Sequence, residues 1–158
     1  MAAPVGRGPG AAVQREARPL RKPRRRRASG SPVVLSELAR AQVCYLTTTG
    51  RVTGRPHTIE IWSALSGRTL YFLAGDGERA DWVRNISRSP GVQVRVGRRR
   101  IRGRGRIVTD PVEQQLARRI VYEKYASTYE GDLGEWRSTA TPVAVDLELA
   151  ADPTDAGP

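Results

Sequence analysis

Hydrophobic and polar residues alternate along several short stretches of the chain, which is the pattern of strands with one buried face, and residues 69–74 are apolar on both faces, as expected of a central strand. Residues 92–96 alternate valine with polar residues, and residues 99–107 alternate arginine with isoleucine and glycine. A two-residue turn between these two stretches would pair Val94 with Ile101. We predict six strands, over residues 43–48, 57–65, 69–74, 92–96, 99–107 and 142–149.

Three further stretches have the spacing of helices, over residues 33–41, 78–88 and 111–125. The last has a strong start signal, because Asp110 precedes Pro111 and Glu113 follows three residues after the aspartate. The strands outnumber the helices, and one helix interrupts the strand order, which favours an antiparallel barrel over a sheet of βαβ units. The predicted fold class is mainly β: a six-stranded antiparallel barrel with two to three peripheral helices.

The 158 residues are enough for one domain of ordinary size. We assign it to residues 33–150, with residues 1–32 as a disordered basic N-terminal extension and residues 151–158 as a loose C-terminal tail. Residues 1–32 carry nine basic side chains against one glutamate, so most of the net charge of +11 lies there. The predicted domain itself is close to electrically balanced.

Two basic features leave a nucleic-acid interpretation open. The run Arg24–Arg27 could contact nucleic acid or an anionic membrane by charge attraction, or it could be a dispensable extension. Arginines at positions 100, 102, 104 and 106 would line one face of the predicted hairpin, with Arg95 opposite Arg100. No aromatic residues interleave with them, so this face could equally be solvated or meet a partner subunit.

A single cysteine and a single histidine exclude several chemistries. Cys44 has no disulfide partner within the chain and lies in an apolar run, so we expect it in the core of a cytoplasmic protein. The sequence lacks the cysteine and histidine cluster of a structural zinc site, and no nucleophile motif accompanies His57. No run is long and apolar enough for a transmembrane helix, and the basic N-terminus lacks the apolar segment of a secretory signal.

The stretch between residues 47 and 62 holds the densest set of candidate binding residues. Glycines at positions 50 and 54 allow backbone angles that other residues resist. Exposed amides beside Arg51, Thr53 and Arg55 would make a cradle for an anion; the alternative is a basic loop that is merely solvated. The loop lies between two strands, so it is neither a Rossmann nor a Walker loop, each of which leads from a strand into a helix.

Several motifs follow one another in order between residues 42 and 149. They are Thr48-Thr49-Gly50-Arg51-Val52-Thr53-Gly54-Arg55-Pro56, then Ala74-Gly75-Asp76-Gly77, then Asp81-Trp82-Val83-Arg84-Asn85-Ile86 with Ser89-Pro90 and Val92-Gln93-Val94. Their order and spacing resemble the deazaflavin-dependent nitroreductase family, which has a TTGRxTG loop, a W-x-x-N helix and an NP-x-V-x-V segment. The resemblance implies a split β-barrel of the flavin-reductase or pyridoxamine-phosphate-oxidase type, with the 8-hydroxy-5-deazaflavin coenzyme F420 as hydride donor.

The resemblance also implies which residues contact this coenzyme. Its phosphate and acidic tail would be held by the loop residues Arg51, Val52 and Thr53. Its ring would lie along the strand residues His57, Thr58, Ile59, Glu60, Ile61 and Trp62. The ring would be covered by Leu73, Ala74, Gly75 and Asp76, and by the helix residues Asp81, Trp82, Val83, Arg84 and Asn85. The catalytic candidates are Tyr129, as proton donor or substrate-pocket residue, and Tyr125.

The implied reaction is hydride transfer from the reduced coenzyme to a quinone, a nitro compound or another activated double bond. Val52 stands where family members commonly carry lysine or arginine, and Leu133 stands where a related enzyme has a pocket tyrosine; these departures concern the substrate more than the coenzyme. One alternative is a split-barrel reductase that binds FMN. Another is a non-catalytic nucleic-acid-binding protein that acts through its basic tail. By analogy with other split barrels, we expect a homodimer.

Overall fold

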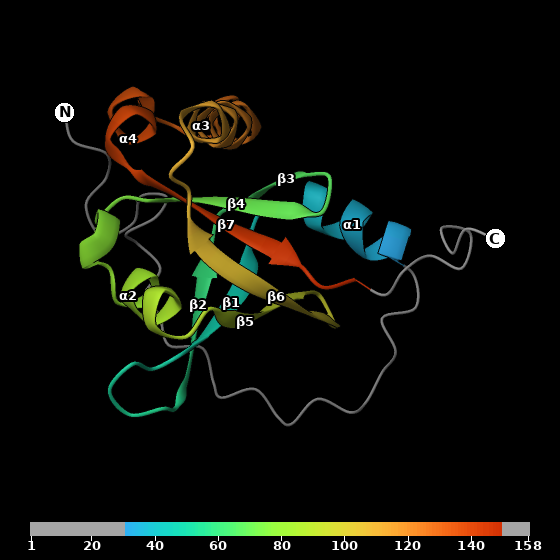
Figure 1. Cartoon of the computed structure of the whole chain (residues 1–158). Helices are drawn as coiled ribbons and strands as arrows, with labels where there is room; N and C mark the ends of the chain where they lie inside the picture. Colours follow the sequence, from blue (N-terminus) through green and yellow to red (C-terminus); the bar gives the residue numbers. More distant parts are fainter. Residues whose placement is uncertain (1–30, 150–158) are drawn as a thin grey trace.

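The computed structural model describes residues 31–149. Seven strands form one curled antiparallel sheet in the order β2-β1-β5-β6-β7-β4-β3 (Figure 1). The strands are β1 (Cys44–Thr49), β2 (Pro56–Ile61), β3 (Ala64–Ser66), β4 (Thr69–Ala74), β5 (Gly91–Val96), β6 (Arg99–Ile107) and β7 (Thr141–Leu147). The helices are α1 (Ser31–Arg40), the short 3-10 helix η1 (Gly77–Arg79), α2 (Asp81–Arg88), α3 (Pro111–Ala126) and α4 (Gly134–Thr139).

The two edge strands of this sheet are neighbours in the chain. Only Trp62 and Ser63 separate β2 from β3. Six strand spacings would hold the edges of a flat sheet about 29 Å apart, whereas the link from Ile61 to Ala64 reaches about 11 Å at most. The sheet therefore curls until its two edges approach each other. This is the split barrel that the motifs imply.

The structure corrects the predicted strand over residues 57–65. This strand ends at Ile61, and the chain resumes as β3 on the opposite edge of the sheet, so the sheet has seven strands instead of six. At the crossing, the backbone N–H of Ser63 donates to the hydroxyl oxygen of Tyr125 at 3.0 Å. A side chain from α3 thus binds a backbone group that would otherwise pair with a neighbouring strand.

Strand β4 separates two hydrophobic clusters. Leu70 and Phe72 face the interior of the barrel, whereas Tyr71 and Leu73 face a second cluster beneath α3 and α4. Both faces of β4 are buried because the barrel fills one side and the two helices cover the other (Figure 1). The fold is therefore a barrel with a helical layer packed on one part of its outer surface.

The β5–β6 hairpin has the predicted register, with Val94 opposite Ile101 and Arg95 opposite Arg100. Glycines alternate with the arginines of β6 because the face of this strand that is directed into the fold is tightly packed against its neighbours. A Cβ atom at Gly105 would lie 2.8 Å from Cγ2 of Ile86, so the glycine lets α2 lie directly against this strand.

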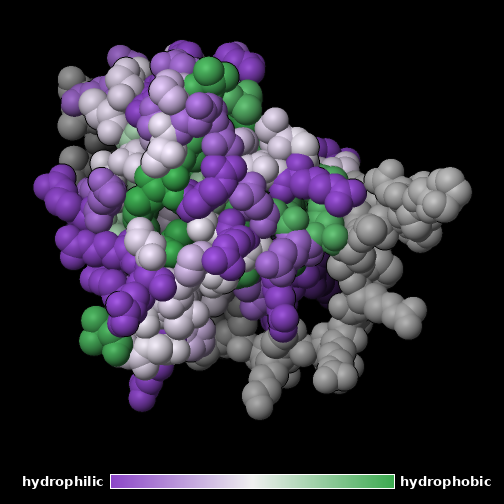
Figure 2. Space-filling view, viewed as in Figure 1, coloured by the Kyte–Doolittle hydropathy of each residue, from purple (hydrophilic) through white to green (hydrophobic). Residues whose placement is uncertain are grey.

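The predicted arginine face is partly paired with acidic residues of the same chain. Arg106 of this face contacts Glu113 and Asp146 at 2.7 and 2.8 Å. Arg99, which precedes the predicted face, contacts Glu37 of α1 at 2.8 Å. The remaining side chains of this face contribute to the polar surface around the hairpin in Figure 2. The charge of Arg106 is thus offset within the fold.

The three predicted helices are confirmed with small shifts. Asp110 caps α3 as expected, because its carboxylate accepts the backbone N–H of Glu113 at 2.9 Å. The helix predicted over residues 78–88 is divided at Ala80 into η1 and α2, and α4 was not predicted. Helix α1 begins at Ser31, inside the predicted extension. The rest of that extension and the predicted C-terminal tail lie outside the described residues. No helix within residues 31–149 is long and apolar enough to cross a membrane.

Candidate functional site

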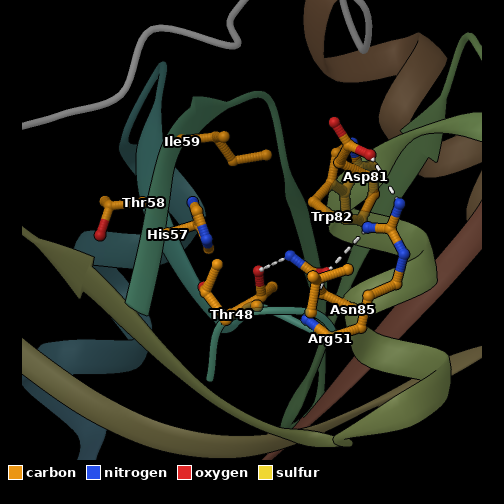
Figure 3. A pocket seen from close by; sticks show the side chains of 11 residues that line it. Thr48, Arg51, His57, Thr58, Ile59, Asp81, Trp82 and Asn85 are labelled. Atoms are coloured by element: carbon orange, nitrogen blue, oxygen red, sulfur yellow. Dashed lines mark hydrogen bonds and ion pairs between the residues drawn. The ribbon is translucent and has the colours of Figure 1, made fainter. Parts of the chain in front are cut away.

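A cleft of about 340 Å³ opens between the β1–β2 loop and the first turns of α2 (Figure 3). Its volume is at the lower end of the range for small-molecule sites. The lining residues come from the end of β1, the loop, the first half of β2 and α2: Thr48, Gly50, Arg51, Val52, Thr53, His57, Thr58, Ile59, Asp81, Trp82 and Asn85.

Strand β2 presents alternate side chains to this cleft. The β1–β2 register pairs Thr48 with His57 on the inner face. Ile59 shares that face and also points inward, whereas the side chain of Thr58, a residue that also lines the cleft, is directed to the other face of the strand (Figure 3). The hydroxyl oxygens of Thr58 and Thr47 lie 2.7 Å apart, so this neighbour is held by a hydrogen bond on the outer face. The inner wall therefore combines an imidazole, a hydroxyl and an apolar side chain.

Asn85 connects α2 with both β1 and the loop. Its side chain is 4% exposed, and its Nδ2 donates to Oγ1 of Thr48 at 3.1 Å. Its Oδ1 accepts from the backbone N–H and from the guanidinium of Arg51, both at 3.1 Å. One turn earlier, Trp82 is buried edge-on against Phe72, with ring centroids 6.0 Å apart. In the W-x-x-N motif, the tryptophan thus packs the helix against the barrel, and the asparagine fixes the loop to the helix.

Arg51 is held along the side of α2 by two acceptors. One guanidinium nitrogen donates to the buried Oδ1 of Asn85, and the other contacts Oδ1 of Asp81 at 3.0 Å (Figure 3). The side chain of Asp81 is 76% exposed, whereas that of Arg51 is 29% exposed. The arginine therefore sits at the rim of the cleft, between a fixed amide and a carboxylate that faces solvent.

The loop itself depends on both of its glycines. Gly54 has a φ of +72° and donates to the carbonyl of Gly50 at 2.8 Å, a conformation that a residue with a side chain rarely adopts. A Cβ atom at Gly50 would lie 2.7 Å from Nε2 of His57 and 2.9 Å from Oγ1 of Thr53. The imidazole can lie against the loop only because Gly50 has no side chain.

The cleft contains half of the residues that the motifs assign to the coenzyme. Those that line it are Arg51, Val52, Thr53, His57, Thr58, Ile59, Asp81, Trp82 and Asn85. Those that do not are Glu60, Ile61, Trp62, Leu73, Ala74, Gly75, Asp76, Val83 and Arg84. Val52 is 86% exposed at the loop, where Figure 2 shows a hydrophobic spot.

Several assigned residues outside the cleft belong to the two hydrophobic clusters. Ile61, Ala74 and Val83 fill the barrel interior, and Leu73 lies beneath the helical layer. Conversely, Thr48 and Gly50 line the cleft although they were not assigned to it. The alternation of β1 could have identified Thr48, because it shares the inner face with the paired His57.

The two candidate tyrosines pack around Trp62 and do not line the cleft. Tyr125 is 1% exposed, and its ring stacks on Trp62 with centroids 4.0 Å apart. Its hydroxyl accepts from Ser63 and donates to the carbonyl of Gln42 at 2.7 Å, and burial raises its pKa. Tyr129 is half-buried with its ring edge against Trp62. The surroundings of Tyr125 are those of a structural hydroxyl group.

Neither a metal site nor a reactive thiol accompanies the cleft. Within the described part of the chain, no group of three or more His, Cys, Asp or Glu side chains could hold a metal ion. Cys44 is fully buried, as predicted, and burial raises the pKa of its thiol to about 11. The groups that line the cleft are therefore backbone, hydroxyl, amide, imidazole, guanidinium, carboxylate and apolar groups.

Comparisons with known structures agree with this fold. An F420 reductase is 21% identical, with 72% of this chain and 91% of that chain covered and a TM-score of 0.54. A conserved hypothetical protein from Mycobacterium tuberculosis is 18% identical, with 84% and 87% covered and a TM-score of 0.60. An FAD-binding protein from Mesorhizobium loti is 19% identical, with 75% and 90% covered and a TM-score of 0.53. At these identities the similarity concerns the fold.

The family of this chain is shown by its sequence. No curated protein matches the chain. The model of the F420H(2)-dependent quinone reductase family matches residues 20–148, which include the whole cleft. The chain therefore belongs to the F420H(2)-dependent quinone reductase family, oxidoreductases whose cofactor is the deazaflavin coenzyme F420.

Proposed function

We propose that the protein transfers hydride from the reduced deazaflavin coenzyme, bound in the cleft, to a quinone. The observation that carries the proposal is that the TTGRxTG loop and the W-x-x-N helix line one cleft and are joined there by the contact of Arg51 with Asn85. The family match supports a quinone as acceptor, and a nitro compound is the second acceptor that the sequence motifs suggest.

The residues of the cleft fit such a coenzyme. Its tail is anionic and its ring is flat and apolar, so the site needs a basic rim and an apolar wall. Arg51 and Thr53 of the loop supply the basic and polar groups, and Ile59 and Trp82 supply apolar side chains from β2 and α2. Gly50 lets the imidazole of His57 lie against the loop, since a Cβ atom there would strike the ring.

The roles of the protein are then to bind, orient and exclude water. When bound, the reduced coenzyme supplies the hydride. Asn85 keeps the loop at a fixed distance from the barrel, so the rim and the apolar wall stay in register for a ligand that spans both.

A titration with oxidised coenzyme, followed by its fluorescence, tests the site. Replacing Arg51 by alanine removes a charge at the rim and a contact to Asn85, so we expect binding to weaken by about 1–3 kcal/mol. The matched control is Arg104→Ala, which removes an exposed arginine from the outer face of β6 and should leave the affinity unchanged. Equal affinities for the two variants would contradict the assignment of the coenzyme to this cleft.

The acceptor is tested with the reduced coenzyme by comparing a soluble quinone with a nitroaromatic compound. At equal concentrations, we expect the reduced coenzyme to be oxidised faster with the quinone than with the nitroaromatic compound. The Arg51→Ala variant should oxidise the coenzyme more slowly than the parent with both acceptors. Faster turnover of the nitroaromatic compound would assign the protein to nitroreduction. Tight binding of FMN without binding of the deazaflavin would instead support the FMN alternative.

A further inference from the structure

We propose that Asp81 is an internal counter-ion, which occupies Arg51 until an anionic group of the coenzyme displaces it. The inference rests on the proposed function, because it takes the coenzyme to be the ligand of the cleft. It assigns Asp81 a role opposite to that of a binding residue: its carboxylate competes with the ligand for the same guanidinium.

The position of Asp81 suits an exchangeable partner. It is the first residue of α2, its carboxylate lies 3.0 Å from the guanidinium of Arg51, and both residues line the cleft. Its side chain is 76% exposed, so the carboxylate can turn into water without losing a buried contact. An exposed ion pair of this kind changes an equilibrium constant by only about two- to fivefold.

Arg51 does not need Asp81 to hold its place. A second guanidinium nitrogen donates to Oδ1 of Asn85, and the backbone N–H of Arg51 donates to the same atom. Asn85 is 4% exposed and is itself fixed by Thr48. When the carboxylate of Asp81 moves away, the arginine therefore remains at the rim with one guanidinium nitrogen free for a new acceptor.

An internal carboxylate at this position makes the site selective for charge. A phosphate or carboxylate of the ligand would contact the nitrogen that Asp81 now contacts, and two anions side by side repel each other. A ligand must therefore bring enough negative charge to replace Asp81, and a weakly anionic ligand of the same shape gains nothing at Arg51. The pair thus gives no advantage to small neutral aromatic molecules.

The test compares Asp81→Asn with Glu78→Gln by titration with oxidised coenzyme. Asparagine keeps the shape of the side chain and removes its charge. Glu78 is exposed three residues earlier, in η1, and its replacement removes the same charge outside the cleft. We expect Asp81→Asn to bind the coenzyme about two- to fivefold more tightly than Glu78→Gln. In an Arg51→Ala background, the two substitutions should have equal effects.

Thermal unfolding without coenzyme gives a second readout. Loss of the ion pair should leave the Tm of Asp81→Asn equal to or slightly below that of the parent, although the variant binds the coenzyme more tightly. A purely structural role would lower the Tm and weaken binding together.

Three results would overturn the proposal. Weaker binding by Asp81→Asn than by Glu78→Gln would make Asp81 a residue that orients Arg51. If Asp81→Asn tightens coenzyme binding equally in the presence and absence of Arg51, the effect comes from the general charge of the surface and not from the ion pair. Absence of coenzyme binding by the parent and by every variant would overturn the proposed function as well, which separates that failure from the other two.

Discussion

Asn85 is the residue that turns three separate segments into one wall of the cleft. It contacts β1 through Thr48 and the loop through Arg51, from a position on α2 that is almost completely buried. A buried polar group without a partner is costly, so removing this amide leaves both the threonine hydroxyl and a backbone N–H unsatisfied.

We expect Asn85→Ala to lower the free energy of unfolding by about 1–3 kcal/mol and to weaken coenzyme binding as well. Denaturant unfolding and the fluorescence titration measure the two effects. The control is Ser87→Ala on the same helix, where an exposed hydroxyl donates to the carbonyl of Val83 and contacts no other segment. An Asn85→Ala protein as stable as the Ser87→Ala protein would contradict this account.

Tyr125 gives a second prediction at this scale, because its two candidate roles have different consequences. Its hydroxyl binds the backbone of Ser63 and Gln42 within the fold. Tyr125→Phe should therefore lower the free energy of unfolding by about 1–3 kcal/mol, with little change in kcat at a temperature where the variant is folded. Tyr122→Phe, a half-buried neighbour whose ring lies under Arg137, is the control. Loss of turnover at unchanged stability would support a catalytic hydroxyl instead.

Local patterns predicted most elements of this fold. The alternation in β5 and β6 predicted their register, and the Asp110 signal located the start of α3, because both depend on neighbouring residues. The break at residues 62–63 was missed because it exists only when the sheet closes. Helix α4 was missed because it has six residues, begins at a glycine and has no side-chain cap. Its stability comes from packing, with Trp136 buried in the second cluster.

The site was predictable to the extent that it is local. The loop and the helix motif both line the cleft, whereas Ile61 of β2 and Leu73 and Ala74 of β4 are buried in the clusters instead. Which side of a strand faces a ligand depends on how the barrel closes, and this is set by the register of distant strands. The contact between Arg51 and Asp81 depends on the same closure.

The glycines of β6 give a prediction at the scale of elements. A Cβ atom at Gly103 would lie 2.5 Å from Cγ1 of Val145 and 3.0 Å from the carbonyl oxygen of Asp146 on β7. Gly103→Ala should therefore destabilise the protein by about 1–3 kcal/mol in a denaturant titration. Gly91→Ala is the matched control in β5, because no atom lies within 4 Å of the added methyl group. If both substitutions are neutral, β6 and β7 are packed less tightly than the structure shows.

At the scale of the whole molecule, one arginine ties the helical layer to the barrel. Arg106 of β6 contacts Glu113 of α3 and Asp146 of β7, and the hydroxyl of Tyr71 donates to Glu113 at 2.6 Å. Hydrogen bonds from the Arg106 guanidinium hold the pKa values of both carboxyl groups below their usual ranges. Burial, and then the hydrogen bond to Glu113, raise the pKa of Tyr71 to about 12.

This cluster predicts a loss of stability in acid. Glu113 and Asp146 stabilise the folded protein fully when the pH is above their ordinary pKa values of 4.5 and 3.8. This stabilisation is lost as the pH falls through the lowered pKa values that the two groups have in the folded protein. We expect the Tm to fall below about pH 4.5, and to fall less steeply for Glu113→Gln. Glu123→Gln, which alters an exposed pair within α3, should follow the parent curve. Identical slopes for all three proteins would contradict a role for the cluster in acid stability.

Two expectations about the whole molecule stay predictions. A homodimer is checked by light scattering of the intact protein. Contact of the Arg24–Arg27 run with nucleic acid or anionic lipid is checked by salt-dependent binding of the parent and of a chain with these four arginines replaced by glutamine.

The two-residue link between β2 and β3 also bears on solubility. An open sheet exposes unpaired N–H and C=O groups along two edges, and such edges can recruit strands from other molecules. Here both edges lie beside the same short link. One edge strand begins at Pro56, which has no N–H to offer, and the other is only three residues long. The connection that closes the barrel therefore also leaves few unpaired edge groups on which another molecule could add a strand. Inserting residues between Ile61 and Ala64 would be the change most apt to expose such an edge.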